Sequence, residues 1–198
     1  GCMNTICGID EAGRGPIAGP VTAAAVVLPD DFPVCCLNDS KKMKPQDREY
    51  AASMIRENAL SLGIGWVWPR EIGRINIHNA TLLAMKRAYR CICVHHEEVV
   101  IDGIFIPHGM TPSETIKECC APLYACVKGG DSIVPAIMAA SIIAKTTRDL
   151  WMKRYGRIDT RYGFEIHKGY GTVSHRRLVG VFGVSTAHRP GFRISVPE

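Results

Sequence analysis

The chain has 198 residues, of which 46% are hydrophobic and 22% are charged, an ordinary balance for a globular protein. This length suits a single domain over residues 1–198 with a sizeable core, and the composition excludes disordered and fibrous classes. Lys and Arg number 24 against 19 Asp and Glu, so the net charge of +5 weakly favours a polyanionic partner without identifying one.

The cysteines and the apolar segments indicate the compartment that we expect. None of the 9 cysteines belongs to a Cys-x-x-Cys pair or has zinc-ligand spacing to a histidine. Because their number is odd and no secretory signal precedes the first predicted strand, we expect reduced thiols, no structural zinc and a cytoplasmic location. No apolar segment approaches the ~20 residues of a membrane-spanning helix, so we expect a soluble protein without a membrane partner.

The first predicted strand ends in two acids and a glycine-rich loop. An apolar run from Ile6 to Ile9 is followed by Asp10, by Glu11 and then by Gly-Arg-Gly at 13–15. Glycine lets the backbone approach a ligand closely and a guanidinium suits phosphate, so acids for a metal would lie beside donors for a phosphodiester. Adjacent acids at a strand end are more often solvated, and Gly-x-Gly alone is a weak motif, so the interpretation requires partners elsewhere in the chain.

The next elements predict a hairpin followed by alternating helices and strands. Residues 20–28 predict a buried strand that pairs antiparallel with the first one. A helix opens at Pro45, a third strand covers 61–68, and a second helix runs over about 76–93. Before the first helix, Asp-Ser-Lys-Lys at 39–42 is either a solvated, capped turn or a pair of cations held near a phosphate backbone.

Two further acids stand at the ends of predicted elements in the second half of the chain. Asp102 ends an apolar run before a glycine, a place where ligands gather in α/β sheets, although a plain turn aspartate fits equally well. Asp131 precedes the longest helical pattern, 132–155, and an N-cap role alone would explain it. Ser141 and Lys145 share one face of that helix, one turn apart.

The remaining segments are less regular. Residues 104–122 predict an irregular insertion with a short helix near 113–119, and a short fifth strand follows at 124–127. Residues 162–172 predict a glycine-broken loop in which aromatic, basic and imidazole groups alternate, a mixture that suits a nucleic-acid contact. A final short helix is expected near 173–181.

The acids together predict a metal-dependent hydrolysis. Carboxylates without cysteine or histidine partners favour Mg²⁺ or Mn²⁺, and crowding them without a cation would raise their pKa values. Two divalent ions about 3.5–4 Å apart can activate a water and stabilise the leaving oxygen of a phosphodiester. In the mixed α/β domain that the element order predicts, phosphodiester hydrolysis is therefore the leading chemistry.

These segments make the chain resemble the type 2 ribonucleases H, the ribonuclease HII family. The resemblance rests on segments that follow one another in the family's order: 8–16 with 18–21, 39–42, 102–103, 128–149 and 162–172. It implies an α/β fold of the RNase H-like type, a five-stranded mixed sheet flanked by helices, with a C-terminal helical extension over about 156–198. It also implies an endonuclease that cuts the RNA strand of RNA/DNA hybrids and cuts 5′ of a ribonucleotide embedded in duplex DNA, leaving 3′-hydroxyl and 5′-phosphate ends.

The same resemblance assigns roles to individual residues. The metal-binding, catalytic acids would be Asp10, Glu11, Asp102 and Asp131. The residues facing the ribose 2′-hydroxyl and the adjacent phosphate would be Gly13, Arg14 and Gly15. Tyr170 would contact the sugar next to the ribonucleotide, and positions near the phosphate backbone are matched by Lys41, Lys42, Ser141 and Lys145. Asp149 is interpreted as a structural residue of the helix surface.

Two departures from the family pattern leave alternatives open. Gly129 and Gly130 separate Lys128 from Asp131, where the family usually has one small residue, so the placement of the fourth acid is open. Residues 105–120 match nothing in the family and are either a substrate-facing loop or a neutral insertion. Besides a monomeric endoribonuclease, the sequence allows a binding module of the same fold that has lost catalysis, or another nuclease of the RNase H-like superfamily.

Overall fold

The computed structural model describes residues 5–110 and 122–197. The described residues form one five-stranded sheet in the order β3-β2-β1-β4-β5, which confirms the predicted mixed α/β architecture. The strands are β1 (Ile6–Ala12), β2 (Val21–Val27), β3 (Ser61–Val67), β4 (Glu98–Asp102) and β5 (Leu123–Val127). Among these residues no helix is both long and apolar enough to cross a membrane.

The pairing of the strands brings the predicted acids to one edge of the sheet. β1 pairs antiparallel with β2, as predicted, and Asp10 lies opposite Ala24. On its other side β1 pairs parallel with β4, and Ile9 lies opposite Ile101. Since parallel neighbours end at the same edge, the residues that follow these two apolar positions, Asp10 and Asp102, are delivered side by side.

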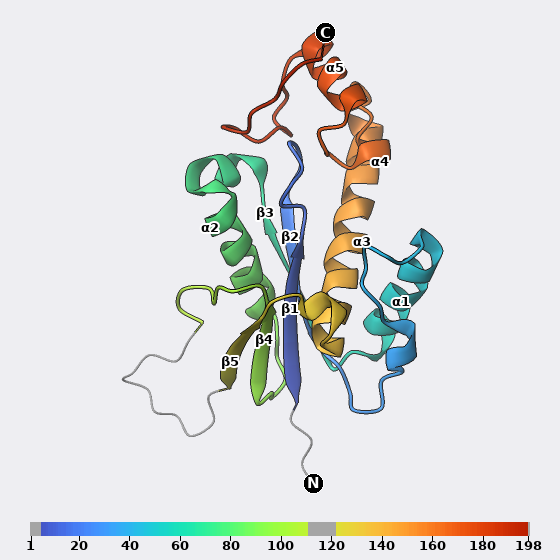
Figure 1. The fold of residues 1–198 in the computed structure, drawn as a ribbon, viewed down its shortest axis with the longest axis vertical. Coiled ribbons are helices and arrows are strands. Elements are labelled where there is room, and N and C mark those ends of the chain that lie inside the picture. The colour runs from blue at the N-terminus through green and yellow to red at the C-terminus, as the bar shows by residue number, and fades with distance from the viewer. Residues whose placement is uncertain (1–4, 111–121, 198) are drawn as a thin grey trace.

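Helices cover both faces of the sheet, as Figure 1 shows, with α2 on one face and α1 and α3 on the other. The helices are α1 (Pro45–Asn58), α2 (Pro69–Tyr89), α3 (Pro135–Ile158), α4 (Phe164–His167) and α5 (Val173–Phe182). Each of the three longest begins with a proline, which has no N–H to leave unpaired in the first turn. The Cα of Gly8 lies so close to the backbone of Ala136 that a β-carbon would collide with it, which is why α3 can pack tightly on β1.

Two predicted helix starts are corrected. The helix expected from about residue 76 begins at Pro69, because two helical pieces meet at a kink where Asn76 adopts a φ of 66°. The side chain of Asn76 accepts a hydrogen bond from Asn79 N at 3.0 Å and caps the second piece, which alone was recognised in the sequence. The long helix begins at Pro135 after a 3₁₀ turn over 130–132, so Asp131 is not its N-cap. The helix expected near 113–119 lies outside the described residues.

The C-terminal segment packs on the loop between β1 and β2. The predicted loop at 162–172 contains the short helix α4, and the predicted final helix is confirmed as α5. Backbone hydrogen bonds join Gly19 N to Ala187 O at 2.8 Å and Arg189 N to Ile17 O at 2.9 Å. The loop that follows the first two acids is therefore held by residues from the far end of the chain.

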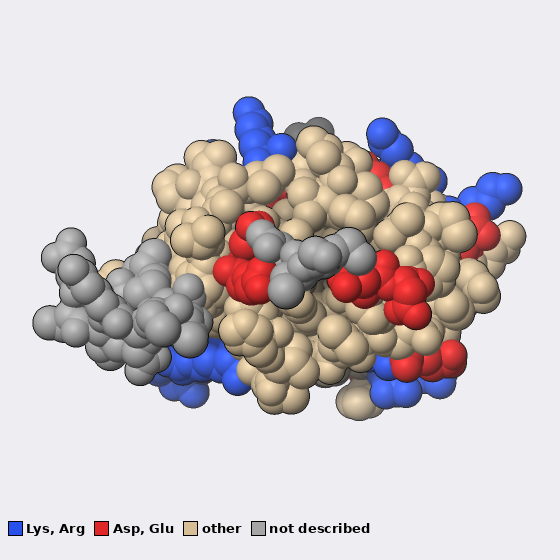
Figure 2. Space-filling view, turned by 90° about the horizontal axis from the view of Figure 1, so that it is seen from below, with Lys and Arg blue, Asp and Glu red and all other residues tan. Residues whose placement is uncertain are grey.

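Charge is unevenly distributed over the surface. Figure 2 shows the molecule from below the view of Figure 1, with acidic side chains gathered toward the middle of this end and Lys and Arg at its rim. A polyanion would meet repulsion over the middle of this end, so the small net charge of +5 does not act equally on all faces.

Candidate active site

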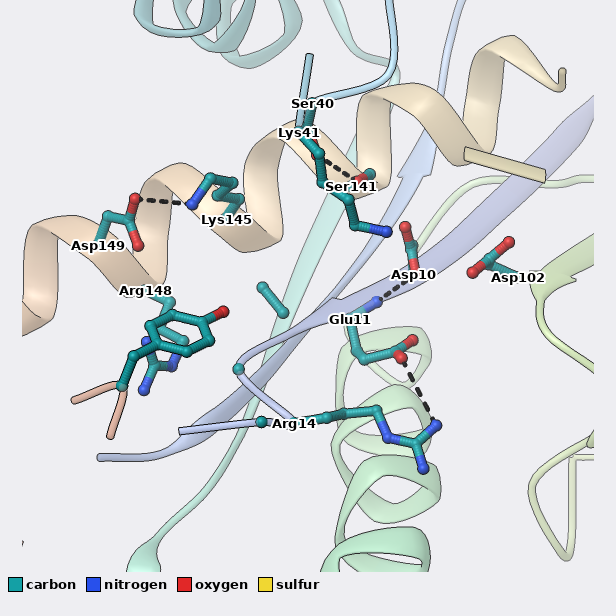
Figure 3. Close-up of a pocket in the computed structure, with 14 residues that line it drawn as sticks. Asp10, Glu11, Arg14, Ser40, Lys41, Asp102, Ser141, Lys145, Arg148 and Asp149 are labelled. Carbon is teal, nitrogen blue, oxygen red and sulfur yellow. Dashed lines mark hydrogen bonds and ion pairs between the residues drawn. The ribbon is translucent and has the colours of Figure 1, made fainter. Parts of the chain in front are cut away.

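Three carboxylates meet at the shared edge of β1 and β4. Asp10 and Glu11 come from the end of β1, and Asp102 is the last residue of β4. One oxygen from each of the three lies within 4.8 Å of the others, and Figure 3 shows the side chains converging. The backbone N–H of Glu11 donates to Asp10 Oδ1 at 2.7 Å, which orients that carboxylate. The acids predicted at the ends of these two strands thus form a cluster.

Burial and mutual repulsion shape the protonation of this cluster. Burial raises the pKa of Asp10 well above its usual value, and the charges of Glu11 and Asp102 raise it further. Burial is also the main reason why the pKa values of Glu11 and Asp102 are raised. Carboxylates held this close without a cation resist ionising together, so a bound cation would stabilise their charged form.

Unpaired oxygens in the cluster fit a hard cation. Glu11 Oε2 and Asp102 Oδ1 are buried and accept no hydrogen bond from the described part of the chain. Buried polar atoms are normally satisfied, and carboxylate oxygens are the preferred ligands of Mg²⁺ and Mn²⁺. The residues present therefore suit a divalent metal ion held between Asp10, Glu11 and Asp102.

Asp131 lies beside this cluster, outside its set of close oxygens. It stands in the 3₁₀ turn after β5, and its charge raises the pKa of Asp102, whereas backbone N–H donors of Gly130 and Asp131 lower it. Lys41 Nζ donates to Asp131 Oδ2 at 3.2 Å, so the fourth acid faces a cation. Gly129 takes a φ of 70°, a conformation that glycine adopts freely, and this turn accommodates the two-glycine spacing.

Most of the predicted site residues line one cavity of about 270 Å³. Those on its surface are Asp10, Glu11, Gly13, Arg14, Gly15, Lys41, Asp102, Ser141, Lys145 and Tyr170. The predicted residues outside this lining are Asp131 and Lys42, and Lys42 is exposed in the turn before α1. Asp149 also lines the cavity, where its Oδ2 accepts from Lys145 Nζ at 3.1 Å, so it orients a cation of the site.

Two walls of the cavity are set by contacts between distant segments. Ser141 Oγ on α3 and Ser40 Oγ lie 2.8 Å apart in a buried hydrogen bond, which anchors the turn that carries Lys41. On the other side Tyr170 is 44% exposed, and a β-carbon on Gly15 would lie 3.7 Å from Tyr170 Cε1. A flat, solvent-facing ring thus stands over the glycine-rich loop.

The comparison with known proteins decides the family. The family model described as ribonuclease HII matches residues 7–193 of the chain. The chain belongs to the ribonuclease HII family. Ribonuclease HII of Dichelobacter nodosus is 44% identical over 187 residues, covering 94% of this chain and 93% of the relative. Ribonuclease HII of Nitratidesulfovibrio vulgaris is 46% identical over 188 residues, covering 94% of this chain and 84% of the relative.

Solved structures of more distant relatives share the fold of this ribonuclease HII family member. The ribonuclease H2 from Pyrococcus horikoshii superposes with a TM-score of 0.69 at 21% identity, over 93% of this chain and 92% of that one. The RNase HII in the PCNA complex from Archaeoglobus fulgidus gives a TM-score of 0.69 at 22% identity, over 98% of each chain. At these identities the likeness concerns the fold, which is the one expected from the resemblance.

Sequence reasoning missed two buried arginines that hold the loop of this ribonuclease HII site. Arg148 on α3 donates to Pro20 O at 2.8 Å and to Ala18 O at 3.0 Å. Arg189 donates from the C-terminal tail to three carbonyls of the same loop, those of Gly13, Arg14 and Gly19. Arg148 and Arg189 are only 1% and 2% exposed, and burial lowers the pKa of Arg148 to about 10 and that of Arg189 to about 9.

For one of the two arginines, the sequence contains a signal that could have indicated its burial. Arg148 follows Ser141 by seven residues on α3, a spacing that returns a side chain to the inward face of a helix. A basic residue on that face is a signal for a buried cation with backbone partners. For Arg189, which contacts a loop about 170 residues earlier in the chain, no local pattern marks the contact.

Proposed function

We propose that this chain is a divalent-metal-dependent endoribonuclease that hydrolyses the RNA strand of RNA/DNA hybrids and incises duplex DNA 5′ of an embedded ribonucleotide. The observation that carries the proposal is the cluster of three carboxylates within 4.8 Å, with two buried unpaired oxygens, beside a glycine-rich loop and a set of cations. Membership of the ribonuclease HII family supports the same reaction class.

The acids of the site would hold the metal ions. Asp10, Glu11 and Asp102 offer hard oxygen ligands at one point, and Asp131 lies close enough to Asp102 to affect its pKa. Mg²⁺ or Mn²⁺ bound there would supply a nucleophilic water and charge stabilisation for phosphodiester hydrolysis. The protein's part is to hold these oxygens in place, which the hydrogen bond from Glu11 N to Asp10 supports.

The loop at 13–15 would distinguish ribose from deoxyribose. Its backbone lines the cavity next to the acids, and Gly13 adopts a φ of 87°, a conformation that favours glycine. The 2′-hydroxyl both donates and accepts hydrogen bonds, so backbone groups held at a fixed place can read it. Tyr170 faces the same loop and would contact the neighbouring sugar.

The cations of the cavity would hold the phosphate backbone. Lys41 and Lys145 line the cavity together with Ser141, which places two ammonium groups on the side of α3. Lys42 is exposed outside the lining and would act on phosphates farther from the cut. Such contacts bind any strand, whereas the loop supplies the preference for a ribonucleotide.

The deciding experiment uses duplex DNA with one ribonucleotide, incubated with Mg²⁺, with Mn²⁺ or with EDTA. Incision 5′ of the ribonucleotide, with 3′-hydroxyl and 5′-phosphate ends and only with metal present, is the expected result. The matched control is the same duplex without the ribonucleotide. Binding without cleavage in Mn²⁺ would indicate a module that has lost catalysis, and cleavage of the control duplex would indicate another kind of nuclease. A monomeric state and a cytoplasmic location stay predictions from the sequence.

A further inference from the structure

A second cavity of about 240 Å³ lies on the other side of the acid cluster. It shares Glu11, Arg14 and Asp102 with the main cavity, so the acids form the border between the two. Tyr170 lines the main cavity and not the second one, whereas Phe105 and His78 line the second one. A chain molecule that crosses the acids from the side of Tyr170 would therefore enter the second cavity.

The second cavity has the chemistry of a nucleoside site. Leu82 and Met85 give it an apolar floor, and Arg14, whose side chain is 51% exposed, gives it a cation at the border. The rings of Phe105 and His78 meet edge to face, with centroids 4.7 Å apart and an interplanar angle of 82°. Apolar and aromatic surface next to one cation suits a base and its sugar better than a free phosphate.

The exposure of Phe105 is not a by-product of a loose segment. Farther along the same segment Met110 is only 5% exposed and Ile106 packs against the core, so the backbone around Phe105 is anchored. Phe105 itself is 52% exposed and its ring is held by His78. An apolar ring kept in solvent at the border of an active site gains stability when a flat ligand covers it.

We propose that Phe105, supported by His78, stacks against the nucleoside immediately 5′ of the scissile phosphate. This inference rests on the proposed function, in which the ribonucleotide lies 3′ of the cut and Tyr170 contacts the sugar beyond it. The strand then continues across Glu11 and Asp102 into the second cavity. Phe105 and Tyr170 clamp the cleaved strand from opposite sides of the acids.

The first test compares KM for two duplexes, one intact and one with an abasic site at the nucleotide 5′ of the cut. We expect Phe105→Ala to raise KM about five- to tenfold on the intact duplex, the lower end of what one aromatic–base contact contributes. The abasic site should raise the KM of the unsubstituted protein by a similar factor and add little in the variant. Phe105→Tyr should behave like the unsubstituted protein, because it keeps the ring.

The matched control is Phe182→Ala, which removes a ring of similar exposure, 48%, from α5. The proposal would be overturned if the effects of Phe105→Ala and of the abasic site on KM were fully additive. It would also be overturned by a variant whose KM depends instead on an abasic site in the complementary strand, because the second cavity would then serve the other strand. Equal urea midpoints for the two alanine variants and the unsubstituted protein would show that folding is not the cause.

A second measurement separates this inference from the proposed reaction. With 2-aminopurine at the nucleotide 5′ of the expected cut, binding to the Asp10→Asn variant should change its fluorescence, and adding Phe105→Ala should remove that change. The signal does not require cleavage, so its loss refutes or supports the stacking contact alone. If the unsubstituted protein leaves the ribonucleotide duplex uncut while the fluorescence response persists, the reaction is wrong and the nucleoside site stands.

Discussion

Replacing Arg189 with alanine should weaken both the fold and the glycine-rich loop. The guanidinium donates to the carbonyls of Gly13, Arg14 and Gly19, at 2.5, 3.0 and 2.9 Å, and the side chain is 2% exposed. Arg189→Ala leaves these three acceptors without their donor, at about 1–3 kcal/mol for each one that water does not reach. The substitution also removes a buried cation whose pKa is lowered to about 9, which offsets part of the loss.

The expected net loss is about 2–4 kcal/mol of unfolding free energy. For a chain of this size that corresponds to a fall in Tm of roughly 5–15 °C. Urea unfolding measures the loss, with Arg193→Ala as the matched control, because Arg193 is an exposed arginine of the same tail. The unfolding free energy of Arg189→Lys should lie between those of the unsubstituted protein and Arg189→Ala, because an ammonium group lacks the planar fork with which a guanidinium reaches three acceptors.

The same substitution should change the reaction beyond its effect on folding. At a temperature where Arg189→Ala is still folded, we expect kcat/KM for the ribonucleotide duplex to fall more than binding of an all-DNA duplex does. The reason is that the loop at 13–15 loses its fixed geometry, whereas the cations of the cavity stay in place. An unfolding free energy within about 0.5 kcal/mol of the unsubstituted protein would refute the reasoning, because it would mean that water replaces the guanidinium at no cost.

Three further outcomes are expected. Asp10→Asn should abolish cleavage and raise the metal-free unfolding free energy by about 1 kcal/mol, because it removes one of three crowded carboxylates. Ser141→Ala should cost about 1–2 kcal/mol, because the buried Ser40 hydroxyl loses its partner. Burial lowers the pKa of His175 to about 4, so the stability it contributes is complete above about pH 6.5 and is lost toward pH 4, by up to about 1.4 kcal/mol per pH unit.

Each of these expectations has its own check. Urea unfolding in EDTA and a cleavage assay test Asp10→Asn, and cleavage at the normal rate would remove Asp10 from the metal site. For the two serines, a double variant Ser40→Ala, Ser141→Ala that is no more stable than the sum of the single variants predicts would contradict the pairing. Between pH 7 and pH 4.5, the unfolding free energy of the unsubstituted protein should fall more steeply than that of His175→Asn. Identical pH dependences of the unfolding free energy would contradict the histidine's role.

The acid cluster shows how far local sequence signals reach. An apolar run predicts a strand, and acids directly after it mark the edge where strands end. The structure then pairs β1 and β4 as parallel neighbours, and this pairing brings Asp10 and Asp102 together. Asp131 was harder to place, since a turn with two glycines has many conformations and only the structure shows it beside Asp102 and Lys41.

The C-terminal part of the chain marks the limit of sequence reasoning. The family resemblance predicted a sugar contact for Tyr170. Arg148 and Arg189 bind backbone carbonyls, which every residue carries, so the sequence does not show which carbonyls they contact; only the helical spacing of Arg148 indicates that its side chain faces inward. The kink at Asn76 was missed for a related reason, because a side-chain cap inside a helical pattern looks like any polar residue.

The sequence by itself determined the strands, the first helix with its opening proline, the acids at the strand ends and, through the resemblance, the family. Each of these features depends on neighbouring residues or on a motif, and both can be recognised in the sequence. The tertiary structure alone decided which carboxylates converge, which arginines hold the loop, and that Phe105 stands exposed at the border of the acids. These are contacts between segments far apart in the chain, and tertiary packing rather than local conformational propensity determines them.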